Sequence, residues 1–241
     1  MVAVKASRLT RLVRRLRKFY GHPDPPPLHD PYLLLLWEQV AYLGSDADRL
    51  AAFRMLEATV GTAPERILSA KVTLLRAVTR RGGAIGVPAR AERLRAVARR
   101  VLDKWEGNLR PVLRLPLDDA RRELARYPAI GPAGAERILL LCGAYPVFGL
   151  ESNALRVLLR LGYGKDHRQW NKSYESAQRA AGKELPASVS ARRNAYLQLR
   201  RHGQTLCRRS APRCDECPLQ SECPTGRAMV TKGVGGPALT D

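Results

Sequence analysis

The segment CRRSAPRCDECPLQSEC, residues 207–223, carries four of the five cysteines in this 241-residue chain. They follow the spacing C-x6-C-x2-C-x5-C, with two prolines between them that favour a compact loop, and they are Cys207, Cys214, Cys217 and Cys223. Four thiolates this close in sequence can converge on one metal centre. Ligand chemistry alone leaves both a zinc ion and an iron–sulfur cluster open, because each accepts four cysteines.

The chain is strongly basic, with 42 lysine and arginine residues against 22 acidic residues and a formal net charge of +20. Such an excess favours a polyanionic partner, since guanidinium groups bind phosphates and release condensed counterions. We predict that the partner is nucleic acid, although an anionic membrane surface or an acidic protein would attract the same charge. The hydrophobic content of 45% is sufficient for a packed core.

The N-terminal residues lack the apolar centre and the cleavage site of a secretory signal, and no apolar run is long enough to span a membrane. We therefore expect a cytoplasmic protein that associates with the nucleoid and not with a membrane. In a reducing compartment, cysteines serve as metal ligands or core residues more often than as disulfides. Cys142, in the apolar run ILLLCGAY, is expected to fill the core.

Helical periodicity predominates along the chain. A basic amphipathic helix is predicted over residues 8–20, where either a solvated face or a phosphate-binding surface would explain the arginines. A nearly all-apolar helix, PYLLLLWEQV, begins at Pro31, after a proline-rich connector. Further helices are predicted at 46–58, 63–69, 71–81, 91–105, 117–127, 133–142, 152–161, 172–181 and 188–205. No alternating strand pattern is found, so the predicted class is all-α, with a disordered tail over 225–241.

The stretch YPAIGPAGAER, residues 127–137, lies between two predicted amphipathic helices. A helix end, a tight glycine-bearing turn and Pro132 at the start of the next helix are the parts of a helix-hairpin-helix. The N–H groups at the start of the second helix can bind a phosphate without reading the base sequence. Taken alone, such a turn is also compatible with a simple αα-hairpin.

The cysteine spacing, placed after a long helical region, resembles the iron–sulfur loop of endonuclease III and of the MutY-type adenine glycosylases. The resemblance implies a [4Fe-4S] cluster with a structural and DNA-contacting role. The hairpin is similar to the L-P-G-x-G hairpin of the same superfamily, which implies DNA contacts at Ala129, Gly131, Ala133 and Gly134. Alanine replaces the first glycine of that motif, so we expect a tighter turn or a weaker phosphate grip.

Catalytic groups are predicted from the same resemblance. The bifunctional enzymes use a lysine two residues after the second hairpin glycine, and Ala133 stands at that position, which disfavours a Schiff-base lyase mechanism. The family's catalytic aspartate matches Glu151, whose carboxylate can stabilise a cationic sugar. The alternative is that Glu151 only caps the helix that begins beside it.

Glu38 lies in the middle of the apolar helix and is costly to bury as an unpaired anion. Without further information, an ion pair with an arginine is the expected arrangement. The helix, however, resembles the P-Y-x-x-x-x-x-E helix of MutY-type and thymine-mismatch glycosylases, which implies that Glu38 is the acid that protonates the leaving base.

Tyr42 and Leu43 follow this helix, where the family usually has a glutamine that fills the space left by an extruded base. An apolar wedge can fill that gap without hydrogen bonding to the orphaned partner base. The alternative interpretation is that the two residues cap the core helix.

Together these features predict a two-lobed, endonuclease III-like fold with a DNA cleft. A six-helix barrel over 33–146 carries the hairpin at 128–134, and residues 1–32 join 147–224 in an iron–sulfur domain. We predict a monomeric, monofunctional DNA glycosylase acting in base excision repair on duplex DNA with a lesion or mismatch. The rival hypotheses are a non-catalytic lesion-sensing protein on the same scaffold and a zinc-ribbon nucleic-acid module.

Overall fold

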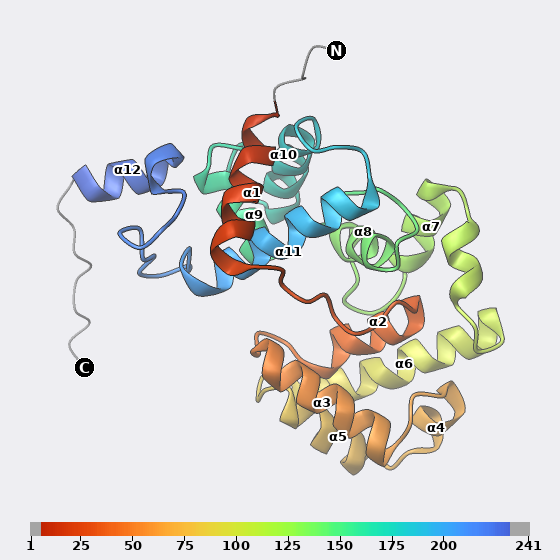
Figure 1. The fold of residues 1–241 in the computed structure, drawn as a ribbon. Coiled ribbons are helices and arrows are strands. Elements are labelled where there is room, and N and C mark those ends of the chain that lie inside the picture. The colour runs from red at the N-terminus through yellow and green to blue at the C-terminus, as the bar shows by residue number, and fades with distance from the viewer. Residues whose placement is uncertain (1–5, 232–241) are drawn as a thin grey trace, which may run out of the picture. The chain divides into compact units, whose positions relative to one another are not determined.

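The computed structural model describes residues 6–231, and in that range it contains twelve α-helices, two short 3₁₀ helices and no strand (Figure 1). The predicted all-α class is therefore confirmed. Contacts within the chain define two compact units, Leu28–Ala144 and Met1–Pro27 with Tyr145–Asp241. Between residues 6 and 231, no helix combines the length and the apolar character needed to cross a membrane.

The unit formed by residues 28–144 is built around the apolar helix α2. Asp30 begins this helix as its N-cap, since its Oδ1 accepts the backbone N–H groups of Tyr32 and Leu33 at 2.9 and 3.2 Å. Neighbouring helices α3, α5, α6 and α8 all contact α2, which explains why it is buried on almost every side. The helices of this unit are α2 (Pro31–Val40), α3 (Asp46–Thr59), α4 (Pro64–Ser69), α5 (Val72–Arg81), α6 (Val87–Trp105), η1 (Arg110–Arg114), α7 (Leu117–Leu124) and α8 (Pro132–Leu141).

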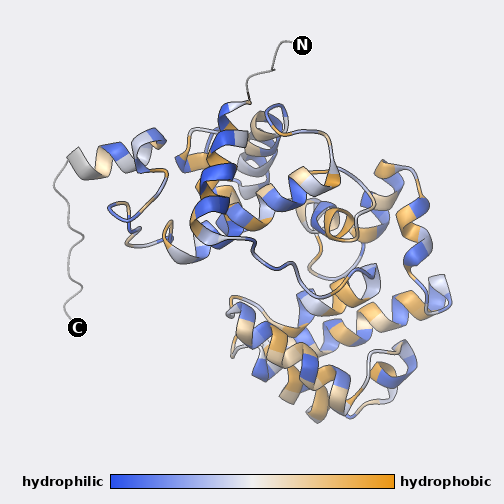
Figure 2. Cartoon of the chain, in the orientation of Figure 1, coloured by the Kyte–Doolittle hydropathy of each residue, from blue (hydrophilic) through white to orange (hydrophobic). Residues whose placement is uncertain are grey.

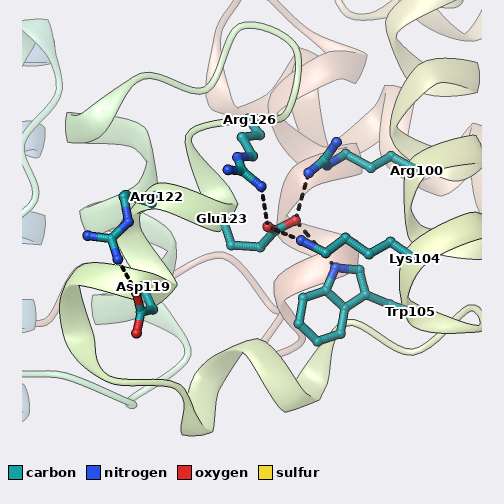
Figure 3. Close-up of polar contacts among 7 residues, drawn as sticks. All are labelled: Arg100, Lys104, Trp105, Asp119, Arg122, Glu123 and Arg126. Atoms are coloured by element: carbon teal, nitrogen blue, oxygen red, sulfur yellow. Dashed lines mark hydrogen bonds and ion pairs between the residues drawn. The ribbon is translucent and has the colours of Figure 1, made fainter.

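A buried carboxylate joins α7 to α6. Glu123 is only 5% exposed, and Figure 3 shows that its oxygens face Arg100, Lys104 and Arg126. The Arg100 Nη2 lies 2.9 Å from Glu123 Oε1, and Lys104 contacts the other oxygen. Burial alone would raise the pKa of Glu123, but the hydrogen bonds from Lys104 and Arg100 outweigh it and hold that pKa below its ordinary value. This cluster fixes the helix that leads into the hairpin.

The second unit contains α1 and the helices that follow residue 145. In α1, an apolar stripe is buried against the unit, while hydrophilic residues cover most of the rest of the helix (Figure 2). Arg8 is partly buried and donates to the backbone oxygens of Leu161 and Glu222 at 3.1 and 2.7 Å, so it ties α1 to the chain around the cysteine loop. The helices are α1 (Arg8–Tyr20), α9 (Ser152–Arg160), α10 (Trp170–Gly182), α11 (Val189–Thr205), η2 (Gln220–Glu222) and α12 (Pro224–Thr231).

Helix α12 lies in the stretch 225–241 that the sequence predicted to be disordered. That prediction is wrong for residues 225–231, and residues 232–241 lie outside the described range. Pro224 starts the helix, where the missing N–H of a proline removes no helical hydrogen bond. The Cys223 sulfur accepts a hydrogen bond from the Gly226 N–H at 3.4 Å, and the backbone oxygen of Cys223 accepts one from the Arg227 N–H at 2.9 Å. The last cysteine of the loop thus also starts a helix.

Candidate functional site

The hairpin lies between α7 and α8, in the stretch where the sequence predicts it. Ala129, which replaces a glycine of the related motif, has φ 59°, a left-handed conformation that glycine adopts without strain. Gly131 precedes α8, and no side chain within residues 6–231 caps this helix start. Ala133 is 6% exposed in the first turn of α8, and the next residue, Gly134, packs against Ile130. The backbone N–H groups of this turn can therefore donate hydrogen bonds to an anionic ligand.

Gln39 connects the hairpin turn to α2. It is 1% exposed, and its Nε2 donates to the Pro128 oxygen at 2.8 Å. The role of Gln39 was not predicted from the sequence, because its partner is a backbone oxygen far along the chain. A polar residue within a nearly all-apolar helix was the available signal.

Glu38 is held between two arginines. Its Oε2 lies 2.9 Å from Arg137 Nη2 and 4.0 Å from Arg49 Nη1, and its side chain is 23% exposed. Arg137 comes from α8, so this ion pair joins the predicted acid to the hairpin helix within one unit. Neighbouring guanidinium groups favour the charged form of a carboxylate. The structure thus shows the ion pair that the residue type alone led us to expect.

Tyr42 and Leu43 are exposed apolar residues between α2 and α3. Their relative exposures are 54% and 76%, and the C-cap residue of α2 is Ala41. Leu43 also has φ 54°, a conformation that is unfavourable for a branched side chain. An exposed leucine held in a strained backbone conformation is typical of a binding element rather than of a packing element.

Arg90 holds the backbone beside this exposed pair. It is 2% exposed, and its guanidinium donates to the oxygens of Ile85 at 3.0 Å, Val40 at 2.7 Å and Gly83. Gly82 completes the contact, because a Cβ there would lie 2.0 Å from the Val40 oxygen. The Arg90 side chain thus holds the end of α2 and the α5–α6 connection close together.

Glu151 begins α9 in the other unit. Its Oε1 accepts the Ala154 N–H at 2.8 Å, and its Oε2 accepts the backbone N–H and the side-chain Nδ2 of Asn153 at 3.0 and 2.9 Å. The capping role is therefore observed. An ionised carboxylate has about four acceptor positions, so one remains for another ligand.

A further set of hydrogen bonds leads from this cap to the cysteine loop. The Asn153 Oδ1 accepts from Arg156 Nη2 at 2.7 Å, and the same guanidinium donates to the backbone oxygens of Cys207 and Gly203 at 2.9 and 2.8 Å. Gly203 permits α9 and α11 to approach closely, since a Cβ at this position would lie 2.6 Å from the backbone oxygen of Asn153. This linking role of Asn153 was not predicted from the sequence.

The four predicted metal ligands line one apolar cavity, together with residues of α9 and α11. Burial raises the pKa of the Cys217 thiol to about 11 and also raises that of Cys214. Protons on such buried thiols are removed when a metal centre binds them. Cys142 lies in the other unit and is partly buried, where burial raises the pKa of its thiol to about 12, as suits an inert residue.

Donors also surround the cysteine sulfurs. Arg160 Nη1 lies 3.3 Å from Cys207 Sγ, and the Leu219 N–H lies 3.4 Å from Cys217 Sγ. Within residues 6–231, no three His, Cys, Asp or Glu side chains converge tightly enough to bind a single metal ion.

The chain is similar in sequence to known proteins over part of its length. No family model matches the chain. Endonuclease III of Bacillus subtilis is 24% identical over 148 residues, and that of Thermotoga maritima is 26% identical over 134 residues. The matched region spans 60% and 56%, respectively, of this chain and of each relative, so it is less than two thirds of either relative's length.

Solved structures extend the similarity over nearly the whole chain. An endonuclease III trapped as a covalent intermediate with DNA has a TM-score of 0.74 and 19% identity, covering 92% of this chain and 97% of that one. The chain therefore has the same fold as these endonuclease III structures. A thermostable thymine-DNA glycosylase has the same fold, with a TM-score of 0.71, 19% identity and coverage of 91% and 97%.

Proposed function

We propose that this endonuclease III-like protein is a monofunctional DNA glycosylase of base excision repair. It binds duplex DNA as a monomer, extrudes a damaged or mismatched base and hydrolyses the N-glycosidic bond. The observation that carries the proposal is the carboxylate of Glu151, fixed at a helix start in this fold, combined with Ala133 where a Schiff-base lysine would stand. Without that amine, water is the nucleophile.

The binding elements are assigned from their exposed groups. The N–H groups at the start of α8 would bind a DNA phosphate near the lesion, with Ala129, Gly131 and Gly134 shaping the turn. Tyr42 and Leu43 would enter the space that the extruded base vacates. Because neither residue carries an amide, they would not read the orphaned base as a glutamine does.

The two glutamates have separate roles in the proposed reaction. Glu151 would stabilise the positive charge that develops on the sugar and accept a proton from the attacking water. Glu38 would give its proton to the departing base. Since Arg137 and Arg49 favour the charged form of Glu38, this role requires that the ion pair loosens when DNA binds.

We propose that Cys207, Cys214, Cys217 and Cys223 hold a [4Fe-4S] cluster. The apolar cavity that they line and the N–H donors around their sulfurs fit thiolates bound to a metal centre. When bound, the cluster would fix the loop and carry no chemical step. Arg208, Arg209 and Arg213, which flank the ligands, would then face DNA phosphates.

Single-turnover assays on a panel of duplexes with different lesions and mismatches test the proposal. We expect at least one duplex to yield an alkali-labile site, and we expect Glu151→Gln to abolish that product while leaving DNA binding intact. If no duplex gives an alkali-labile site although DNA binds tightly, the enzymatic proposal is wrong.

A non-catalytic lesion-binding protein is the second candidate. One observation favours it: both glutamates already have structural partners, an ion pair for Glu38 and a helix cap for Glu151. In that case, neither Glu38→Gln nor Glu151→Gln changes any DNA product, and lesion-containing duplexes bind more tightly than undamaged ones.

A further inference from the structure

A chain of hydrogen bonds reaches the Cys217 sulfur through His202. This histidine lies in α11 and is 2% exposed. Its Nε2 is 3.5 Å from Cys217 Sγ, and its Nδ1 is 2.9 Å from the hydroxyl oxygen of Tyr20 in α1. That hydroxyl lies a further 2.9 Å from Thr205 Oγ1, so the chain of contacts runs from α1 to the cysteine loop within one unit.

The direction of these hydrogen bonds follows from the donor inventory. A metal-bound cysteine sulfur carries no proton and can only accept, so the facing Nε2 must carry the proton of a neutral imidazole. Nδ1 must then accept, and the Tyr20 hydroxyl is the group positioned to donate to it. The Thr205 hydroxyl can donate to the Arg201 oxygen, 2.9 Å away, or to the Tyr20 oxygen. In either case the Tyr20 hydroxyl donates to His202 Nδ1.

The other described donors to the cysteine sulfurs differ in kind. Backbone N–H groups serve Cys217 and Cys223, from Leu219 and Gly226. The Arg160 guanidinium that contacts Cys207 Sγ also donates to backbone oxygens of the loop. His202 differs from these donors, because it is a neutral side chain whose proton position is set by a second residue.

We propose that His202 donates a hydrogen bond to the Cys217 sulfur and thereby raises the reduction potential of the bound cluster, with Tyr20 as the positioning residue that selects the donating tautomer. Hydrogen bonds to cysteine sulfurs withdraw electron density and stabilise the more reduced state. The inference rests on the proposed cluster and is independent of whether the protein excises bases.

The test is a redox titration of the purified full-length protein, with iron and protein measured in each sample. His202→Leu removes the donor, so we expect a more negative potential. His202→Gln places an amide N–H near the former Nε2 and restores the potential toward the wild-type value. Tyr20→Phe shifts it in the same direction as His202→Leu, but less. Tyr163→Phe is the matched control: its hydroxyl donates to Glu184 at 3.0 Å in the same unit, so we expect no shift.

The outcomes separate the two proposals. Wild-type protein without iron after anaerobic reconstitution contradicts the cluster, and with it this inference. Iron-loaded His202→Leu at the wild-type potential contradicts the inference alone. If His202→Leu fails to hold iron, Tyr20→Phe decides: a negative shift supports the hydrogen-bond chain, and an unchanged potential overturns it.

Discussion

Arg90→Met tests how the exposed pair Tyr42 and Leu43 is held. The substitution keeps the length of an apolar stem and removes the guanidinium that donates to three backbone oxygens. Each buried acceptor left without its donor costs about 1–3 kcal/mol, and relief from burying a charge offsets part of that cost. We therefore expect the free energy of unfolding to fall by about 3 kcal/mol, which lowers the melting temperature by roughly 10 °C.

Thermal unfolding followed by circular dichroism measures this loss. A fluorescent base analogue beside the target base should also report weaker base extrusion at temperatures where the variant is folded, because the loop that carries Leu43 has lost its anchor. Arg99→Met, on an exposed position of the same helix, is the control and should change neither quantity. The reasoning is refuted if Arg90→Met melts within about 1 °C of wild type.

Three other substitutions test separate parts of the account. Glu151→Ala removes the α9 cap and should lower the free energy of unfolding by about 1 kcal/mol, whereas Glu151→Gln keeps an acceptor and should lose less; equal melting temperatures for both would contradict the cap. Glu123→Gln leaves Arg100, Lys104 and Arg126 without their anion and should cost about 3–5 kcal/mol at neutral pH. The folded-state pKa of Glu123 lies below its ordinary 4.5, so wild type should lose its extra stability over Glu123→Gln as the pH falls below that value. If wild type still melts at a higher temperature than Glu123→Gln in acid, the ionised Glu123 is not the source of that stability. Arg137→Gln removes the guanidinium that favours the charged form of Glu38, so, if Glu38 is the acid, it should keep its proton and support excision to higher pH. An unchanged pH profile would mean that the Arg137–Glu38 ion pair has only a structural role.

The helical class and the hairpin could be predicted from the sequence because both depend on local patterns. The apolar run after Pro31 and the glycines around Pro132 act within a few residues. Local signals were also misread. Helix α6 begins at Val87 rather than at 91, because Gly86 adopts a left-handed conformation and a proline follows in the first turn. The helix after Cys223 was missed because a cysteine is not a usual helix cap.

The supports of the site could not be predicted, because their partners are distant in sequence. Arg90 and Gln39 donate to backbone oxygens, which every residue carries. No residue pattern in the sequence therefore predicts which oxygen each side chain binds. The partner of Glu38 was expected to be an arginine, but this arginine-rich chain offers many, and only the packing of α8 on α2 selects Arg137. His202 was likewise hidden, since its role depends on how α1 packs on α11.

The most direct test of the central claim is a product analysis on a duplex that the protein cleaves or binds preferentially. Each reaction is divided and analysed with alkali, without alkali, and after borohydride treatment. With Ala133 at the lysine position, we predict base release, strand cleavage only after alkali and no borohydride-trapped complex. Strand cleavage without alkali together with a trapped covalent complex would contradict the account, because it would require an amine nucleophile that the proposed mechanism lacks.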